Sequence, residues 1–231
     1  MTSNAIPYNF LSDNAMMLLF VLNIIGMAYV FMMNGSNILE RAKSMFYHGK
    51  QSNPYTDRTH ITKICNLLLY LQLFFYCSII AFGDMQYSTP YYVGKTPYIV
   101  LAAFYLLAAI ALLAKRVLYD LCNATLFSEE VAREWRQSYF FTIKLSGFIL
   151  FPLVVCIIFI KDFSKTYYTI YLIFALLIYT AVVISSAIKI IFKKKCFYLD
   201  IFLYLCALEL LPIAILWRTI HVINAFLIIK F

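Results

Sequence analysis

The stretch YFFTIKLSGFILFPLVVCIIFI, residues 139–160, decides the fold of this chain. It carries one charged side chain, Lys144, and consists largely of aliphatic and aromatic residues. About 20 consecutive apolar residues form a helix long enough to cross the roughly 30 Å hydrocarbon core of a bilayer. Residues 139–160 therefore predict a transmembrane helix.

The composition of the whole chain indicates the same environment. Of 231 residues, 64% are hydrophobic and only 13% are charged, whereas a soluble domain has about 45–50% apolar and about 25% charged residues. The excess apolar surface must face lipid. The net charge of +8 comes from Lys and Arg in short loops between apolar runs, which favours a membrane surface over nucleic acid as its counterpart.

Further apolar runs lie on both sides of residues 139–160. The last of them extends from residue 197 to residue 229, which as one helix would measure roughly 50 Å. We interpret it as one span, a break near residues 212–218 and an outer interfacial tail at 219–229; a strongly tilted continuous helix is the alternative. The chain is thus predicted to be one all-α transmembrane domain, residues 1–231, a polytopic bundle of about six helices. Its other spans are predicted at about 15–33, 64–82, 98–114, 167–190 and 197–217.

The distribution of cations predicts the orientation of the bundle. Most of the 19 Lys and Arg residues fall in or beside the loops at 34–63, 115–138 and 191–196. By the positive-inside rule these loops are cytoplasmic, and both termini lie outside. With both termini on the same side, the chain must cross the membrane an even number of times, which supports six spans. The expected location is a bacterial cytoplasmic (inner) membrane.

Two of these loops are predicted to contain helix. Apolar residues between Ile38 and Phe46 share one face, so a short interfacial helix is expected there, capped by Asn34 or Ser36; an ordinary connector is the alternative. Ser128 can cap a helix that has Glu129 and Glu130 in its first turn. We expect that helix to continue into the span at 139–160.

Charged groups inside lipid are costly and are candidates for function. Glu209 lies about twelve residues into the last span, just past the expected midplane. Arg218 can pair with it only if Pro212 kinks the helix, because nine residues at 100° place the two on opposite faces. Tyr105 is expected at a similar depth. Glu209 is interpreted as a structural anchor hydrogen-bonded to tyrosines, with a proton or ion site and a partner contact as alternatives.

The remaining polar residues are predicted to have structural roles. Lys144 can extend its ammonium to the interface, or it belongs to an intramembrane polar site. Asn66, Gln72 and the Ser185-Ser186 pair are typical of interhelical hydrogen bonds. The six cysteines form no CxxC pair and the three histidines share no ligand spacing. We therefore predict no catalytic residues, no metal site and no cofactor.

The sequence resembles a known family at two motifs. One is Lys144-Leu145-Ser146-Gly147 followed by Phe151-Pro152; the other, more specific, is FLYLCALELLP at residues 202–212. Both resemble a family of bacterial inner-membrane proteins, typical of Bacteroidota, filed as domain of unknown function "forty-two seventy-one". The resemblance covers about residues 101–220 well and the preceding part more loosely. It implies a six-span inner-membrane protein and directs attention to Lys144, Gly147, Pro152, Glu209 and Pro212.

These observations lead to three hypotheses for function. The first is a non-enzymatic subunit or assembly factor of a cell-envelope membrane complex, with membrane lipids and other membrane or envelope subunits as partners and no nucleic acid. The second is a small proton-coupled transporter or channel that uses Glu209. The third is an intramembrane enzyme, which would need a cluster of acids, bases or metal ligands that the sequence does not show.

Overall fold

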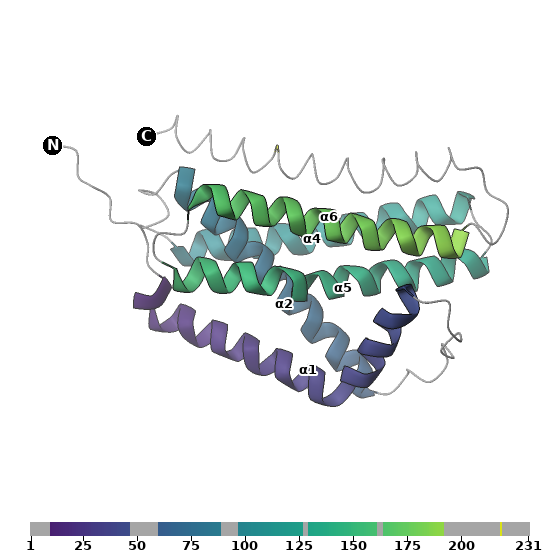
Figure 1. Cartoon of the computed structure of the whole chain (residues 1–231), viewed down its shortest axis with the longest axis horizontal. Helices are drawn as coiled ribbons and strands as arrows, with labels where there is room; N and C mark the ends of the chain where they lie inside the picture. Colours follow the sequence, from purple (N-terminus) through teal and green to yellow (C-terminus); the bar gives the residue numbers. More distant parts are fainter. Residues whose placement is uncertain are drawn as a thin grey trace.

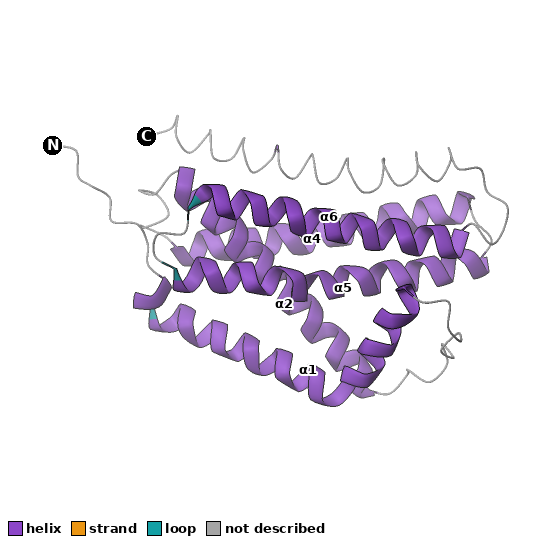
Figure 2. Cartoon of the chain, viewed as in Figure 1, coloured by secondary structure: helices purple, strands orange, loops and turns teal. Residues whose placement is uncertain are grey.

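The computed structural model of the protein describes residues 10–46, 60–88, 97–126, 129–160, 164–191 and 218. Every regular element in this part of the chain is helical (Figure 2), which confirms the all-α prediction. The predicted last span at 197–217 and the tail at 219–229 lie outside the described residues, apart from Arg218. The elements are a short 3-10 turn η1 (Phe10–Ser12) and the helices α1 (Asn14–Phe46), α2 (His60–Ser88), α4 (Pro97–Leu126), α5 (Glu129–Phe159) and α6 (Lys165–Ile191).

Each of the five helices contains a stretch long and apolar enough to cross a membrane. This is the pattern of a multi-pass membrane protein. The chain runs back and forth between the two ends of the bundle, so that α1, α4 and α6 start at one end, on the left of Figure 1, and α2 and α5 start at the other. The second end, where α4 stops and α5 begins, carries Lys115, Arg116, Arg133 and Arg136. We call it the charged end.

One predicted helix boundary is wrong, and a second prediction about a helix is confirmed. The span expected to close at Lys115-Arg116 continues as α4 to Leu126, because Lys and Arg are good helix formers and leaving the lipid does not interrupt the backbone hydrogen bonds. The helix predicted to start after Ser128 begins at Glu129 and continues into the span at 139–160, as expected, ending at Phe159. The helices therefore extend past the apolar stretches that identified them.

The predicted interfacial helix is also different from what the structure shows. Residues 38–46 belong to α1, so Asn34 and Ser36 lie inside a helix and cap nothing. Asn34 instead accepts a hydrogen bond of 2.7 Å from the Asn37 side chain. The final third of α1 changes direction toward α5 (Figure 1), and the Gly35-Ser36 pair supplies the kind of sequence at which helices bend.

Helices α2 and α5 form the centre of the bundle. In their most apolar stretches 44% and 39% of the residues are buried, against 17% in α1, 11% in α4 and 22% in α6. The two central helices approach closely at Gly147, where an added Cβ would lie 4.0 Å from Leu73 Cα. The three peripheral helices therefore present most of their apolar side chains outward, where lipid or another protein can cover them.

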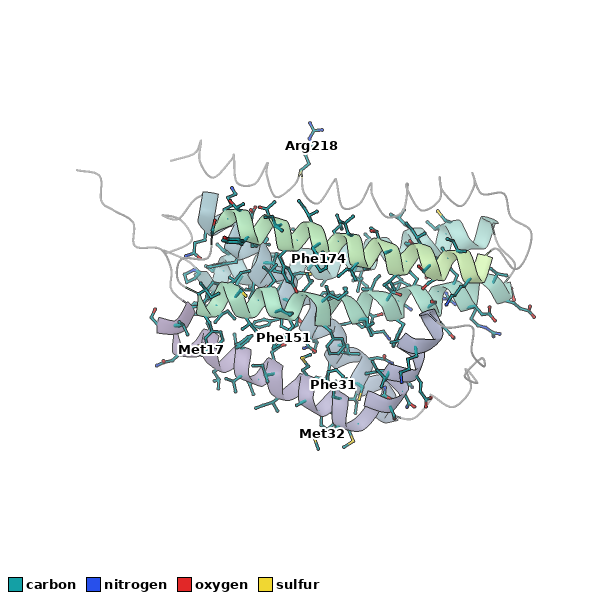
Figure 3. All side chains as sticks on the ribbon, in the orientation of Figure 1. Met17, Phe31, Met32, Phe151, Phe174 and Arg218 are labelled. Carbon is teal, nitrogen blue, oxygen red and sulfur yellow. The ribbon has the colours of Figure 1, made fainter. Side chains whose placement is uncertain are left out.

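Three buried clusters hold the helices together. The first contains at least one buried residue from each helix, including Phe20, Tyr76, Leu101, Leu153 and Tyr168. Figure 3 shows Phe151, which packs against this cluster, directed toward α1, where its ring stacks on Phe20 at 6.4 Å. The second cluster consists of Leu73, Tyr119, Trp135, Tyr139, Ile143, Val183 and Ala187. The third consists of Val30, Ile38, Cys65, Leu69 and Phe141.

Two tyrosines of α6 fasten that helix to its neighbours through backbone carbonyls. Tyr171 donates a 2.7 Å hydrogen bond to the carbonyl of Ile149, three residues before Pro152. Proline lacks an N–H and disturbs the hydrogen bonds of the preceding turn, and in lipid a neighbouring side chain must satisfy the loosened carbonyls. Tyr168 donates in the same way to Ile80 of α2 at 3.0 Å.

The first helix is tied to the rest of the bundle at its start. Asp13 caps α1 by accepting hydrogen bonds from the backbone N–H groups of Ala15 (3.0 Å) and Met16 (3.4 Å). The other oxygen of the same carboxylate accepts a hydrogen bond from the Tyr98 hydroxyl at the start of α4. One side chain thus caps the start of α1 and links it to the start of α4.

Candidate functional site

Cations and aromatic rings gather around α5 toward the charged end. Tyr139, Phe140 and Phe141 are consecutive, so their side chains leave α5 about 100° apart and reach different neighbouring helices. Each ring has a cation within 6.0 Å of its centroid. We call this set the cation–aromatic collar; its members are Lys115, Arg116, Tyr139, Phe140, Phe141 and Lys144.

Lys144 is held by α2. Its ammonium donates a 2.7 Å hydrogen bond to Asn66 Oδ1 and lies 5.6 Å from the ring centroid of Tyr70 and 6.0 Å from that of Phe141. Tyr70 follows Asn66 by four residues on α2, so one face of that helix offers both an amide oxygen and an aromatic ring. This arrangement lets a lysine at the midpoint of α5 remain inside the bundle.

Lys115 lies between α5 and α6. Its ammonium is 5.4 Å from the ring centroid of Tyr139 and 5.9 Å from that of Tyr179. Tyr179 donates a hydrogen bond of 3.3 Å to the Tyr139 hydroxyl, which places both rings beside the same charge. Cation–aromatic contacts of this kind stabilise by about 0.5–2 kcal/mol, more where water is excluded.

Arg116 is the most accessible member of the collar. Its guanidinium lies 5.7 Å from the ring centroid of Phe140 and is close enough to act electrostatically on the Tyr70 phenol. Among the described residues it has neither a hydrogen bond nor an ion pair. Arg136, at the same end of the bundle, differs because it forms a 3.1 Å salt bridge with Asp120.

The rings beneath the collar are structural. Trp135, Tyr119 and Tyr139 are fully buried in the second cluster. The rings of Tyr119 and Tyr139 stack at 4.1 Å, and the indole of Trp135 lies 5.8 Å from the Tyr139 ring. Trp135 and Tyr139 therefore pack inside the bundle.

The predicted site residues are only partly brought together. From Lys144, a series of ring contacts leads through Tyr70 and Phe74 to Tyr105, whose ring meets Phe74 edge-on at 5.7 Å. Arg218 is exposed and points away from the described helices (Figure 3). Glu209 and the predicted helix break at Pro212 lie outside the described residues. The transporter hypothesis that depends on Glu209 stays a prediction.

Other polar side chains of the spans bond in ways that the sequence only partly indicated. Asn66 makes an interhelical bond, as predicted, but Gln72 donates to the Tyr76 hydroxyl of its own helix at 2.7 Å. Ser185 donates to the carbonyl of Ala181, also in its own helix. Within the described helices, no three His, Cys, Asp or Glu residues lie together in a way that could hold a metal ion.

One intramembrane amide lacks a partner. Asn23 of α1 has a buried Oδ1 without a hydrogen bond, and its side chain makes none among the residues that the structure describes. It lies nine residues into α1, or roughly 14 Å along the helix, close to the middle of a core about 30 Å thick. Sequence reasoning missed this position, because a single Asn in an apolar run is common and its partner depends on the packing.

Comparison with known proteins supports the resemblance seen in the sequence. The family model described as "Domain of unknown function (DUF4271)" matches residues 16–220. The match extends the resemblance into the first two helices, beyond the motifs that suggested it. No curated protein and no solved structure matches the chain.

Proposed function

The chain belongs to the family of the domain of unknown function DUF4271, and on that premise we propose that it is a non-enzymatic subunit or assembly factor of a cell-envelope membrane complex. We place it in a bacterial inner membrane, with its charged end and the loops at 34–63, 115–138 and 191–196 in the cytoplasm. Its expected partners are lipids and a second membrane protein.

The observation that carries this proposal is the unpaired amide of Asn23. An amide without a hydrogen bond in hydrocarbon costs several kcal/mol, and asparagine in a membrane helix bonds to neighbouring helices. Leu19, Leu22 and Ile25 of the same helix are exposed, so a foreign helix can lie against α1 and reach Asn23. The terminal torsion of asparagine is soft, which lets the amide turn toward that helix.

The polar groups elsewhere in the spans support a structural role over a catalytic one. Thr142, Ser146, Thr169 and Thr180 each donate to a backbone carbonyl of their own helix. Such bonds satisfy a hydroxyl in lipid and commit it to the helix. Asn23 differs from these four residues because its Oδ1 has no hydrogen bond, a property that it shares with the buried Ser186 hydroxyl of α6.

Replacing Asn23 with leucine is expected to remove the partner. After mild detergent extraction of the tagged protein from its native host, wild-type protein should co-purify with a stable membrane protein and the Asn23→Leu protein should not. The variant should also have a higher melting temperature in detergent, because it no longer buries an unpaired amide. A photo-reactive residue at Leu22 should crosslink to the same partner in cells.

Thr180→Val serves as the matched control. It also converts a polar side chain of a peripheral helix into an apolar one, but the Thr180 hydroxyl is already bonded to the Leu177 carbonyl. The partner should remain bound to this variant. Recovery of the wild-type protein only as a monodisperse monomer, with no crosslinked species at Leu22, would rule out the proposed role.

The proposed orientation predicts which positions a membrane-impermeant thiol reagent can reach. In a chain whose native cysteines are replaced by serine, cysteine at Lys165, at the start of α6, should label in cells whose outer membrane alone is permeable. Cysteine at Arg133, near the start of α5, should label only after the inner membrane is opened. Labelling of both positions from one side would contradict the alternating topology.

A further inference from the structure

Arg116 combines features of an anion site. Arg116 lies nineteen positions after Pro97, the first residue of α4, which corresponds to roughly 28 Å of helix. It therefore lies at the edge of a hydrocarbon core about 30 Å thick. Its guanidinium rests on the Phe140 ring and is not bonded to any described residue. Five N–H donors in a planar fork are therefore directed to whatever lies beside α4 at this depth.

A second positive charge lies next to it. Lys115 precedes Arg116 on the same helix, and its ammonium is fixed between the rings of Tyr139 and Tyr179. Arg116 and Lys115 are thus two consecutive cationic residues at headgroup depth. The guanidinium geometry of Arg116 suits a phosphate group, which it can bind through two parallel hydrogen bonds.

The surface of α4 below these cations is apolar. Leu113, Ile110 and Leu106 lie three, six and ten residues before Arg116, a spacing that keeps them on one side of the helix. Each is about 60% exposed, at 61%, 62% and 60%. A molecule with a phosphate at Arg116 would therefore have about 15 Å of apolar surface beneath it, running toward the membrane centre.

From this juxtaposition we propose that Arg116 and Lys115 bind the phosphate of an anionic phospholipid, with its acyl chains along Leu113, Ile110 and Leu106. The positive surface selects an anionic headgroup over a zwitterionic one, and the apolar stripe selects a lipid over a free anion. The site lies on α4, away from the Asn23 face of α1, so it goes beyond the proposed role as a complex subunit.

Arg136 provides the comparison that a test needs. It is a cation at the same end of the bundle, but Asp120 already neutralises it at 3.1 Å. Substituting either arginine with glutamine removes the same charge from the protein. Arg116→Gln removes a cation that has no ion pair among the described residues, whereas Arg136→Gln removes one that is paired with Asp120.

The test measures lipid binding by native mass spectrometry. Purified protein in detergent is titrated with phosphatidylglycerol, and in parallel with phosphatidylcholine of the same acyl chains. Wild-type protein should retain phosphatidylglycerol in preference to phosphatidylcholine, and Arg116→Gln should weaken retention of phosphatidylglycerol about tenfold or more, the effect of losing one charge-assisted hydrogen-bonded pair. Arg136→Gln should bind as the wild type does, and Arg116→Lys should restore part of the affinity.

Three results would overturn the proposal. Equal retention of the two lipids by wild-type protein would show that the headgroup charge is not recognised. Equal losses in Arg116→Gln and Arg136→Gln would show attraction by net charge and no site. Displacement of the lipid by millimolar inorganic phosphate would show that the site takes the free anion. Retained helical content and an unchanged elution volume show that each variant is folded.

Discussion

Replacing Trp135 with alanine is expected to lower the free energy of unfolding by about 3–5 kcal/mol, the usual cost of removing a large buried aromatic side chain. Trp135 is fully buried where α4, α5 and α6 meet, and its indole packs on Tyr139. Tyr139 in turn stacks on Tyr119 and lies under the Lys115 ammonium. The cavity would therefore form beneath the cation–aromatic collar, where neighbouring rings are held by further contacts and cannot fill it.

The measurement is reversible unfolding in mixed micelles with increasing sodium dodecyl sulfate, followed by circular dichroism. Phe174→Ala is the matched control: it also removes an aromatic ring, but from the outward side of α6, where the ring is 58% exposed (Figure 3). That control should change the free energy of unfolding by less than about 1 kcal/mol. If the two variants unfold alike, the second cluster does not stabilise the bundle as described.

Gly147→Leu should destabilise the protein by an amount toward the upper end of about 1–3 kcal/mol, the range for overpacking. Gly147 is the point where α5 approaches α2, and the nearest atoms to an added Cβ include Leu73 Cα. A leucine there meets backbone, which moves only if α2 moves. Because α2 and α5 form the centre of the bundle, displacing one disturbs all three buried clusters.

Gly147→Ala is expected to have the opposite sign. The 4.0 Å separation from Leu73 is an ordinary van der Waals contact, so a single methyl group fits. Alanine also restricts the unfolded chain more than glycine does and should stabilise a helix by about 0.5–1 kcal/mol. The same micelle titration checks both variants. A leucine variant as stable as the alanine variant would show that the helices are farther apart at this point than the structure has them.

Hydropathy located the described spans but not the ends of their helices. The predicted cores at 15–33 and 98–114 fall inside α1 and α4, which end at Phe46 and Leu126. An apolar run reports which residues prefer lipid, whereas a helix ends where its backbone hydrogen bonds end. The end of the apolar run and the end of the helix differ most at the charged end, because Lys and Arg are good helix formers and continue the helix.

The candidate site was predictable in its parts and not in its assembly. Lys144 was conspicuous as a charge in an apolar run, and the Tyr139-Phe140-Phe141 triplet is visible in the sequence. Their partners Asn66, Lys115 and Arg116 come from helices whose proximity no local pattern specifies. The lack of a partner is equally invisible in the sequence: only the packed structure shows that the Asn23 amide has no hydrogen bond.

The contacts of α1 have a consequence for how the protein is made. The Asp13 cap is completed by Tyr98, 85 positions later, and the Phe20 ring stacks on Phe151 of the fourth described span. At a synthesis rate of about 5–20 residues per second, residue 151 follows residue 20 by roughly 7–26 s. During that interval the Phe20 ring of α1 cannot stack on Phe151, and lipid or an insertion factor must cover it. Helix α1 can thus pack against α2 soon after both are made, but its contact with Phe151 forms only later.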